Sequence, residues 1–238
     1  MDAVRDGTAE LRGDEARHLA RVLRAEPGQR YEISDNRAAY LAEIAEVRGD
    51  RIVFRALQPI DTPEPPVRVT LCAALIKFDR FEWMVEKATE LGVERILLVE
   101  TARSEKGLFE ASRKRAERWE RIARESSQQA RRWRVPQISP AVRFPRCLAE
   151  EAGCRYFLTE AEAGAEATAP PLWRALPARR LSSDRVALLV GPEGGWTGEE
   201  RRAAAEAGWQ AVSLGPQVLR AETAAAAALA IVANAWMA

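Results

Sequence analysis

The chain of 238 residues is poor in the residues that build metal centres and disulfide frameworks. It has one histidine, His18, and three cysteines, Cys72, Cys147 and Cys154, without the paired spacing of a zinc site. A single histidine cannot form a metal cluster, so we expect no metal. Isolated cysteines fit a reducing compartment, and we expect a cytoplasmic protein.

Long apolar runs and an excess of charge of one sign are also missing. The longest apolar stretch, residues 224–238, is mostly alanine, contains Asn234 and is too short to span a bilayer. The charged residues 1–15 lack the apolar core of a signal peptide, so we expect no membrane partner. The chain has 36 Lys and Arg and 35 Asp and Glu, so its net charge is only +1. Any nucleic-acid site must therefore be a local basic patch.

What is present divides into two parts. In residues 1–62, a short helix candidate with Leu19, Val22 and Leu23 on one face precedes short alternating runs separated by turn residues. That pattern is typical of a small antiparallel barrel. The proline-rich stretch 59–66 then predicts a stiff linker. We expect a barrel domain in residues 1–62 and a second domain in residues 63–238.

The second part alternates apolar strands with longer helices. Near-continuous apolar runs such as "VRVTLCAALI" and "RILLVETA" indicate buried strands of a parallel sheet covered on both faces. We expect one long basic helix over residues 106–132 and a last helix from about Ala221. The stretch 162–184 has the composition of a surface excursion that the core does not need. The predicted class is therefore α/β.

Ligands of open parallel sheets bind at the carboxyl ends of strands, and the run "LLVGPEGGWTGEE" places bare backbone there. Gly191, Gly194 and Gly195 let ligand atoms approach main-chain groups. The run lacks the Lys-Ser/Thr of a phosphate-binding loop. The alternative interpretation is a tight turn into a helix that Thr197 caps and Glu200 completes as a capping box.

A second tip, "SLGPQVLRAETA", repeats the pattern of strand, Gly-Pro turn and helix start. It adds Arg220, Glu222 and Thr223 where the helix begins. Turns alone rarely need an arginine and a glutamate beside them. The loop after "RYFL" is a third candidate tip, so the three tips together predict one cleft.

These two carboxyl-terminal runs closely resemble the signature of the SPOUT superfamily of methyltransferases, and within it the RsmE family, which methylates N3 of a uridine in 16S ribosomal RNA. The runs "HLARVLRAEPGQRYEISDN", "KFDRFEWMVEKATELGV" and "RWERIARESSQQARRWRVP" extend the resemblance along nearly the whole chain. It implies a PUA-like β-barrel, a trefoil-knotted parallel-sheet domain, S-adenosylmethionine as methyl donor, ribosomal RNA or the small subunit as partner, and a homodimer. By this resemblance the cofactor contacts are Thr159, Glu160, Val190, Gly191, Pro192, Glu193, Gly194, Gly195, Leu214, Gly215, Leu219, Arg220, Thr223 and Ala224.

Methylation of N3 requires that nitrogen to lose its proton. Arg220, and second Arg80, are our candidates to stabilise the negative charge that develops on the base. Glu222 or Glu193 could accept the proton if burial raises its pKa. Alternatively, Glu222 positions Arg220 through an ion pair, and Glu193 only caps the turn.

RNA binding requires local basic patches, because phosphate neutralisation supplies most of the non-specific affinity. Trp133 could stack on a base or belong to the core, and His18 is expected to be structural. Residues 113–115 alternate with acidic residues and are expected to solvate a helix face. The expected RNA contacts are Arg17, Arg21, Arg24, Lys77, Arg80, Lys87, Arg131, Arg132 and Arg134.

Three rival functions stay open: a ribosomal RNA-binding protein without catalysis, a SPOUT methyltransferase that acts on another RNA nucleotide, and a Rossmann-type nucleotide-binding enzyme. Intact glycine turns and Arg220 argue against the first. The third would need a glycine fingerprint after the first strand, and "LIKFDRFEW" has none.

Overall fold

The computed structural model describes residues 3–160, 169–181 and 184–236. The chain divides into two compact units, Met1–Glu64 and Pro65–Ala238. Each unit has its own hydrophobic core.

The amino-terminal unit is a four-stranded antiparallel sheet with one helix. Its strands are β1 (Thr8–Arg12), β2 (Arg30–Ser34), β3 (Ala39–Arg48) and β4 (Arg51–Ile60), in the order β1-β4-β3-β2, and α1 (Asp14–Arg21) follows β1. Alternating residues of the strands, such as Ile44, Ile52 and Phe54, form the core. This alternation is what the sequence pattern predicts for strands with one buried face.

The end of α1 differs from the expectation. Leu19 packs against the core, but the helix ends at Arg21, and Val22 and Leu23 beyond it are 62% and 57% exposed. The prediction that Val22 and Leu23 share one helix face with Leu19 is therefore wrong. His18, expected to be structural, is also exposed.

The carboxyl-terminal unit is built on a six-stranded sheet in which all neighbouring strands run parallel. The strand order is β10-β8-β9-β5-β6-β7, which confirms the predicted α/β class. The strands are β5 (Arg68–Ala74), β6 (Arg95–Glu100), β7 (Gln137–Arg143), β8 (Cys154–Leu158), β9 (Arg185–Val190) and β10 (Gln210–Val212).

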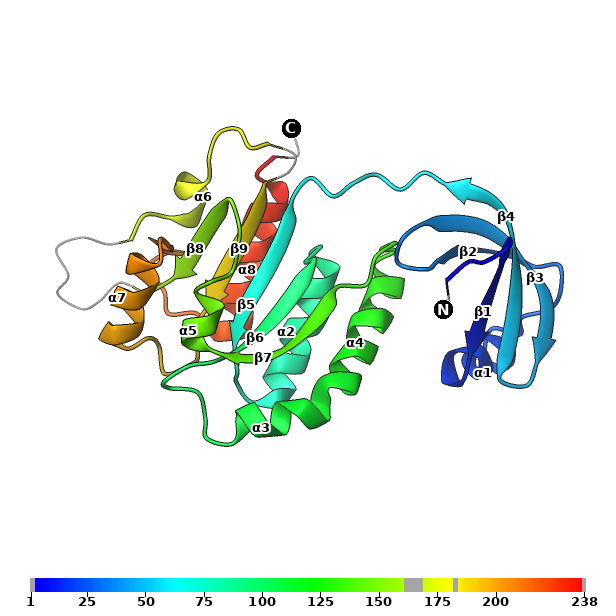
Figure 1. Cartoon of the computed structure of the whole chain (residues 1–238), viewed down its shortest axis with the longest axis horizontal. Helices are drawn as coiled ribbons and strands as arrows, with labels where there is room; N and C mark the ends of the chain where they lie inside the picture. Colours follow the sequence, from blue (N-terminus) through cyan, green and yellow to red (C-terminus); the bar gives the residue numbers. More distant parts are fainter. Residues whose placement is uncertain (1–2, 161–168, 182–183, 237–238) are drawn as a thin grey trace. The chain divides into compact units, whose positions relative to one another are not determined.

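Helices cover both faces of this sheet (Figure 1). One face packs against α2 (Phe78–Glu90), α4 (Ala116–Gln129) and α8 (Ala221–Asn234), and the other against α5 (Phe144–Cys147) and α7 (Gly198–Glu206). Successive residues of β5 point to opposite cores, since Leu71 belongs to the first and Cys72 to the second. Burial on both faces explains why the central strands are apolar throughout.

Three sequence expectations for this unit need correction. The predicted long helix over 106–132 is interrupted: α3 (Leu108–Ser112), a 3-10 turn (Arg113–Arg115) and α4 replace it. Strand β7 was not among the expected elements, and it contains Pro140. It lies at the edge of the sheet, where its register shifts near that residue, and edges and bulges tolerate proline.

The third correction concerns the stretch 162–184, which was expected to be disposable. Residues 161–168 and 182–183 lie outside the described residues. The described part forms α6 (Leu172–Ala175), and Leu172 is buried in the core. The hydroxyl of Tyr156 also donates to the carbonyl of Ala175 at 3.0 Å.

The topology marks one edge of the sheet for ligand binding. The connection after β5 leads to β6 on one side, whereas the connection after β9 leads to β10 on the other side of the sheet. Loops that follow neighbouring strands and diverge leave a crevice at the carboxyl ends, and ligands of open α/β sheets bind there. Among the described residues, no helix is long and apolar enough to cross a membrane, and no cluster of ligating side chains could hold a metal ion.

Candidate active site

The loops after β8, β9 and β10 meet around one hollow at the carboxyl edge of the sheet. The structure thus brings together the three strand tips that the sequence singled out. Eleven of the fourteen expected cofactor contacts line the hollow; Gly194, Arg220 and Thr223 do not. Its lining consists of Leu158, Thr159, Glu160, Val190, Gly191, Pro192, Glu193, Gly195, Trp196, Arg201, Ser213, Leu214, Gly215, Gln217, Leu219, Ala221 and Ala224.

Two glycines of the turn after β9 make room for protein side chains. A Cβ atom at Gly191 would lie 2.7 Å from Cε2 of Trp196, which is closer than real Cβ contacts. A Cβ atom at Gly194 would meet Cβ of Arg103 at 3.2 Å. Gly195 has a φ of 68°, which favours glycine. The absence of side chains here is therefore explained by packing and backbone conformation.

Trp196 forms the floor of the hollow. Its ring packs against Phe157 and Phe144, with centroids 4.6 and 5.5 Å away, and its Nε1 donates to the carbonyl of Leu158 at 2.8 Å. A buried indole N–H needs such an acceptor. Trp196 thereby joins the turn after β9 to the end of β8, an arrangement that the sequence did not predict.

The loop after β6 holds the turn after β9 from the opposite side. Arg103 donates from Nη1 to the carbonyl of Gly194 at 2.7 Å, and the N–H of Ala102 donates to Oε1 of Glu200 at 2.8 Å. The other carboxylate oxygen of Glu200 closes the expected capping box with Thr197. Glu200 is buried, so its carboxylate depends on these donors.

The turn after β10 is fixed by its own backbone and by the segment around α6. Ser213 accepts from the N–H of Gly215 and donates to its carbonyl, each at 3.1 Å. The N–H of Leu172 donates to the carbonyl of Ser213 at 2.9 Å. Nothing lies within 4 Å of the position that a Cβ atom would take at Gly215, so this backbone faces open space.

The residues expected to take part in catalysis lie around the start of α8 and the turn after β9. Arg220 is exposed at the N-cap position of α8. Glu222 follows in the first turn, and its Oε2 atom is buried without a hydrogen-bond partner among the described residues. The alternative in which Glu222 pairs with Arg220 is therefore not realised in this structure. Glu193 instead forms an ion pair with Arg80 of α2, so it does more than cap its turn.

One of the expected RNA contacts, Arg132, is instead engaged within the protein. Its guanidinium donates to the carbonyls of Thr89 and Val93 at 2.5 and 2.8 Å. Burial lowers the pKa of Arg132 to about 10. Arg132 therefore stabilises the end of α2, and we remove it from the expected RNA contacts.

Among the remaining expected RNA contacts, some form ion pairs within the protein and others are exposed to solvent. Lys87 pairs with Glu86 and Glu90, and Arg17 pairs with Asp14 and Asp50. The exposed members of the expected set are Arg21, Arg24, Lys77 and Arg131. Arg103, which the sequence did not single out, adds a further exposed cation at the carboxyl edge of the sheet.

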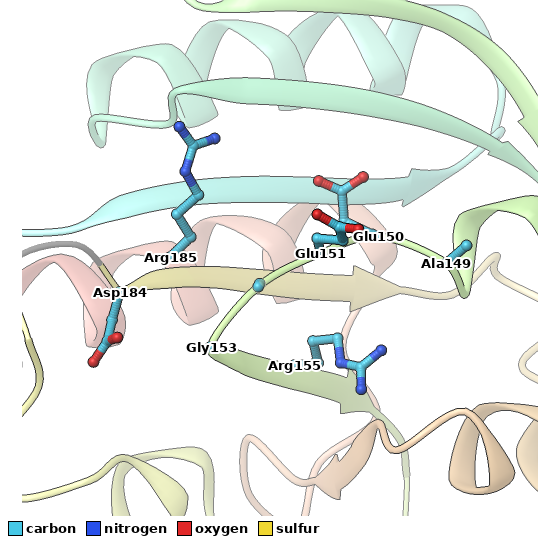
Figure 2. Close-up of a pocket in the computed structure, with 8 residues that line it drawn as sticks. Ala149, Glu150, Glu151, Gly153, Arg155, Asp184 and Arg185 are labelled. Carbon is cyan, nitrogen blue, oxygen red and sulfur yellow. The ribbon is translucent and has the colours of Figure 1, made fainter.

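A second hollow lies at the opposite edge of the sheet, near the amino ends of β8 and β9 (Figure 2). Charged side chains line it, including Glu151, Arg155 and Asp184. Two others are already paired within the protein, Glu150 with Arg95 and Arg185 with Glu94. It offers little apolar surface for the face of a purine ring, so we place the candidate site at the carboxyl edge.

Comparisons with known proteins identify the family of this chain. A family model described as an RNA methyltransferase domain matches residues 63–233, and one described as an RNA methyltransferase PUA domain matches residues 11–57. The ribosomal RNA small subunit methyltransferase E of Mycobacterium tuberculosis is 34% identical over 228 residues, covering 92% of this chain and 84% of that protein. That of Bacillus subtilis is 27% identical, covering 94% of this chain and 89% of that protein.

Solved structures extend the likeness to three dimensions. The crystal structure of ribosomal RNA small subunit methyltransferase E from Neisseria gonorrhoeae bound to S-adenosyl methionine is 29% identical, with a TM-score of 0.83, over 99% of this chain and 96% of that one. A methyltransferase from Legionella pneumophila in complex with SAM is 28% identical, with a TM-score of 0.82, over 97% of this chain and 93% of that one. This chain belongs to the ribosomal RNA small subunit methyltransferase E family of RNA methyltransferases.

Proposed function

We propose that this protein transfers the methyl group of S-adenosylmethionine to N3 of a uridine in 16S ribosomal RNA of the small ribosomal subunit. The observation that carries the proposal is the hollow into which the three loops converge. Family membership supports the reaction class, and the relatives named above support the substrate. A ribosomal RNA substrate also supports a cytoplasmic location.

The residues around the hollow fit a nucleoside cofactor. Leu158, Val190, Leu214 and Leu219 provide apolar surface, and the open backbone at Gly215 offers main-chain groups for the edge of an adenine ring. When bound, S-adenosylmethionine supplies an electrophilic methyl group on its sulfonium. We infer that the expected contacts that line the hollow hold it.

The chain's own residues must then remove one proton and stabilise one charge. The N3–methyl bond forms as the bond between sulfur and that methyl breaks, and the N3 proton leaves to a base. Glu222 is our candidate for that base, because its buried Oε2 has no hydrogen-bond partner among the described residues. Arg220, two residues earlier at the N-cap position of α8, is our candidate to stabilise charge on the base carbonyls.

The ion pair between Arg80 and Glu193 gives these residues another role. It connects α2 to the turn after β9. We infer that it positions this turn while Arg80 contributes positive charge beside the substrate. Because Glu193 is already paired, Glu222 is the stronger candidate for the proton acceptor.

We further propose that the amino-terminal unit is a PUA-like barrel that binds RNA and that the chain after β9 forms a trefoil knot. The turn after β10 supports the knot, because residues 170–172 hydrogen-bond to Ser213 across it. A homodimer is supported by large apolar side chains left exposed near the site and on α2: Val218 is 74% and Trp83 42% exposed. Light scattering of the purified protein tests the dimer.

Mass spectrometry of ribosomal RNA tests the function. A strain that lacks the protein should lose one methyl group from a uridine of 16S RNA, and the purified protein with S-adenosylmethionine should restore it. Offering free RNA and assembled small subunits separately identifies the substrate. Methylation of a different nucleotide would favour the second SPOUT activity, and RNA binding without transfer would favour a binding protein.

A further inference from the structure

The segment around α6, residues 169–181, is anchored to the carboxyl-terminal unit at both of its ends. The N–H of Leu172 donates to the carbonyl of Ser213 at 2.9 Å, and the indole N–H of Trp236 donates to the carbonyl of Pro177 at 3.0 Å. The side chain of Leu172 is buried in the core. Side chains that the segment exposes therefore have a defined place on the surface.

One of these exposed side chains is a tryptophan. Trp173 follows the buried Leu172 and is 60% exposed, and the guanidinium of Arg174 lies over its ring, 4.9 Å from the centroid. A tryptophan left in water forgoes the large apolar area that burial of its ring would remove from solvent. Single exposed apolar residues are common on protein surfaces, so the exposure alone identifies no partner. The surroundings of Trp173 do.

The charges of the segment favour a polyanion. Residues 169–181 contain three arginines, Arg174, Arg179 and Arg180, and no aspartate or glutamate. Arg180 donates to the carbonyls of Leu181 and Asp184, whereas Arg174 and Arg179 are exposed. In a chain with a net charge of +1, a local excess of this kind is what binding to RNA phosphates requires.

Trp173 lies beside the hollow at the carboxyl edge of the sheet but outside its lining. Pro171 forms an isolated parallel bridge with Ser213, and Ser213 lines the hollow. Trp173 follows Pro171 by two positions, so the Cα atoms of these two residues lie within about 8 Å of each other. An RNA strand that delivers a uridine to the hollow therefore has a neighbouring nucleotide near Trp173.

We propose that Trp173 and Arg174 form a stacking platform for an unpaired base of the RNA substrate that flanks the methylated uridine. The inference rests on the proposed methylation of RNA. Proteins bind unpaired RNA bases by stacking them on aromatic rings and on arginine guanidinium planes, and this pair exposes both. Because every base has a π face, such a platform positions the strand without reading its sequence.

The first test compares two probes that carry the same phosphates. One is a labelled single-stranded oligouridylate, and the other is an oligomer of equal length whose riboses carry no bases. Trp173→Ala should weaken binding of the oligouridylate by about 5- to 100-fold, which corresponds to the loss of one base stack. It should bind the abasic oligomer within about twofold of the wild-type affinity, because the phosphate contacts remain. Trp173→Phe keeps an aromatic face and should bind the oligouridylate within about threefold of wild type.

Leu181→Ala is the matched control. Leu181 is 70% exposed at the end of the same segment, but its side chain has no π face, so both affinities should stay unchanged. Thermal unfolding of each variant confirms that the fold is retained. An equal loss of affinity for both probes in Trp173→Ala would overturn the stacking platform, and so would an equal loss in Leu181→Ala. A lower molecular mass of Trp173→Ala in light scattering would assign Trp173 to contact with a second copy of the chain and overturn it as well.

Methyl transfer separates this inference from the proposed function. With 16S RNA as substrate, Trp173→Ala should raise KM for the RNA and leave kcat and the affinity for S-adenosylmethionine near their wild-type values, because the platform holds the strand away from the reacting atoms. An unchanged KM in an active enzyme would overturn the platform and leave the methyltransferase assignment standing. If the wild-type protein transfers no methyl group to RNA, the proposed function fails, and the two probes still decide whether a base stacks on Trp173.

Discussion

The guanidinium of Arg103 donates to the carbonyl of Gly194 at 2.7 Å, across 91 positions of sequence. The aliphatic part of the same side chain fills the space where Gly194 lacks a Cβ atom. The loop after β6 thus holds the turn after β9 in place, together with the hydrogen bond from Ala102 to Glu200. The shape of the candidate cofactor site therefore depends on a loop that does not line it.

Replacing Arg103 tests this dependence. Arg103→Ala should weaken binding of S-adenosylmethionine several-fold, because the turn after β9 loses one of its restraints. Its unfolding free energy should fall by less than about 1 kcal/mol, since the side chain is exposed. Lys106→Ala, in the same loop, is the control and should bind normally. Calorimetry and urea denaturation measure both quantities, and normal binding by Arg103→Ala would show that the restraint is unnecessary.

Gly191 gives a test of the floor of the hollow. Gly191→Ala would place a Cβ atom 2.7 Å from the indole of Trp196, so the ring must move. Overpacking of this kind costs about 1–3 kcal/mol, and displacement of the floor should also weaken cofactor binding.

Gly153→Ala provides the comparison for that variant. A Cβ atom there would have its nearest contact, with Asp184, at 3.4 Å, and the position lies outside the candidate site. Its unfolding free energy in urea should change by no more than about 0.5 kcal/mol. Equal effects of the two alanines would contradict the role given to Gly191.

Neighbouring arginines after α4 should separate stability from RNA binding. Arg132→Met removes two hydrogen bonds from a charged donor to buried carbonyls, so unfolding free energy should fall by about 2–3 kcal/mol. It should leave the salt dependence of RNA binding unchanged. Arg131→Met should leave the unfolding free energy unchanged. It should reduce the slope of the logarithm of the RNA-binding constant against the logarithm of salt concentration by about 0.7–0.9. A lower slope for Arg132→Met would return this residue to the RNA-binding set.

Catalysis should respond to Arg220 and Glu222 without a matching loss of cofactor affinity. Glu222→Gln keeps the shape of the side chain but removes the proton acceptor, so the rate of methyl transfer should fall by about 10²–10⁴-fold. Arg220→Ala should lower the rate by about 10²–10³-fold, as loss of a charge-stabilising donor does. Single-turnover transfer to RNA measures both rates. Full activity of either variant would exclude the role assigned to that residue.

We expect the stability of the amino-terminal unit to fall at low pH as two carboxylates, Glu10 and Asp35, become protonated. Hydrogen bonds from Arg51 and then Arg12 lower the pKa of Glu10 to about 2. For Asp35, burial opposes ionisation, but the backbone N–H groups of Ala38, Arg37 and Val4 outweigh it, so the pKa of Asp35 lies below its usual value.

Because both pKa values are depressed in the folded state, the stabilisation is complete above the unfolded-state values of about 4 to 4.5 and is lost as the pH falls toward about 2. Hydrogen-exchange protection of β1 and β4, corrected for the intrinsic rate, should fall across this range. Glu10→Gln and Asp35→Asn together should flatten the dependence. An equally steep loss in the double variant would assign it to other groups.

The sequence predicted those parts of the fold that depend on local pattern. The apolar runs of β5 and β9 and the capping residues Thr197 and Glu200 appear as expected, because burial on both faces and helix capping leave short-range signals. Strand β7 was missed because Pro140 hides an edge strand with a shifted register. Leu172 was missed because its packing partners are distant in sequence.

In the candidate site, too, the sequence predicted local features but not contacts between residues far apart in the chain. The glycine turns mark the three loops, but their pattern does not tell a ligand from a neighbouring side chain, and at Gly191 and Gly194 the neighbour is Trp196 or Arg103. Arg201 and Thr159 are 42 positions apart, and Arg103 and Gly194 are 91 apart. Contacts of this kind follow from the strand order, so no local motif could have revealed them.

The indole beneath Gly191 gives the protein an optical probe of its own. Trp196 is one of seven tryptophans, and it is buried while lining the hollow. A ligand that enters therefore changes the polarity and the collisional quenching around this ring directly. Intrinsic fluorescence can follow occupancy of the site in unlabelled protein, with Trp196→Phe identifying the share of the emission that comes from the floor.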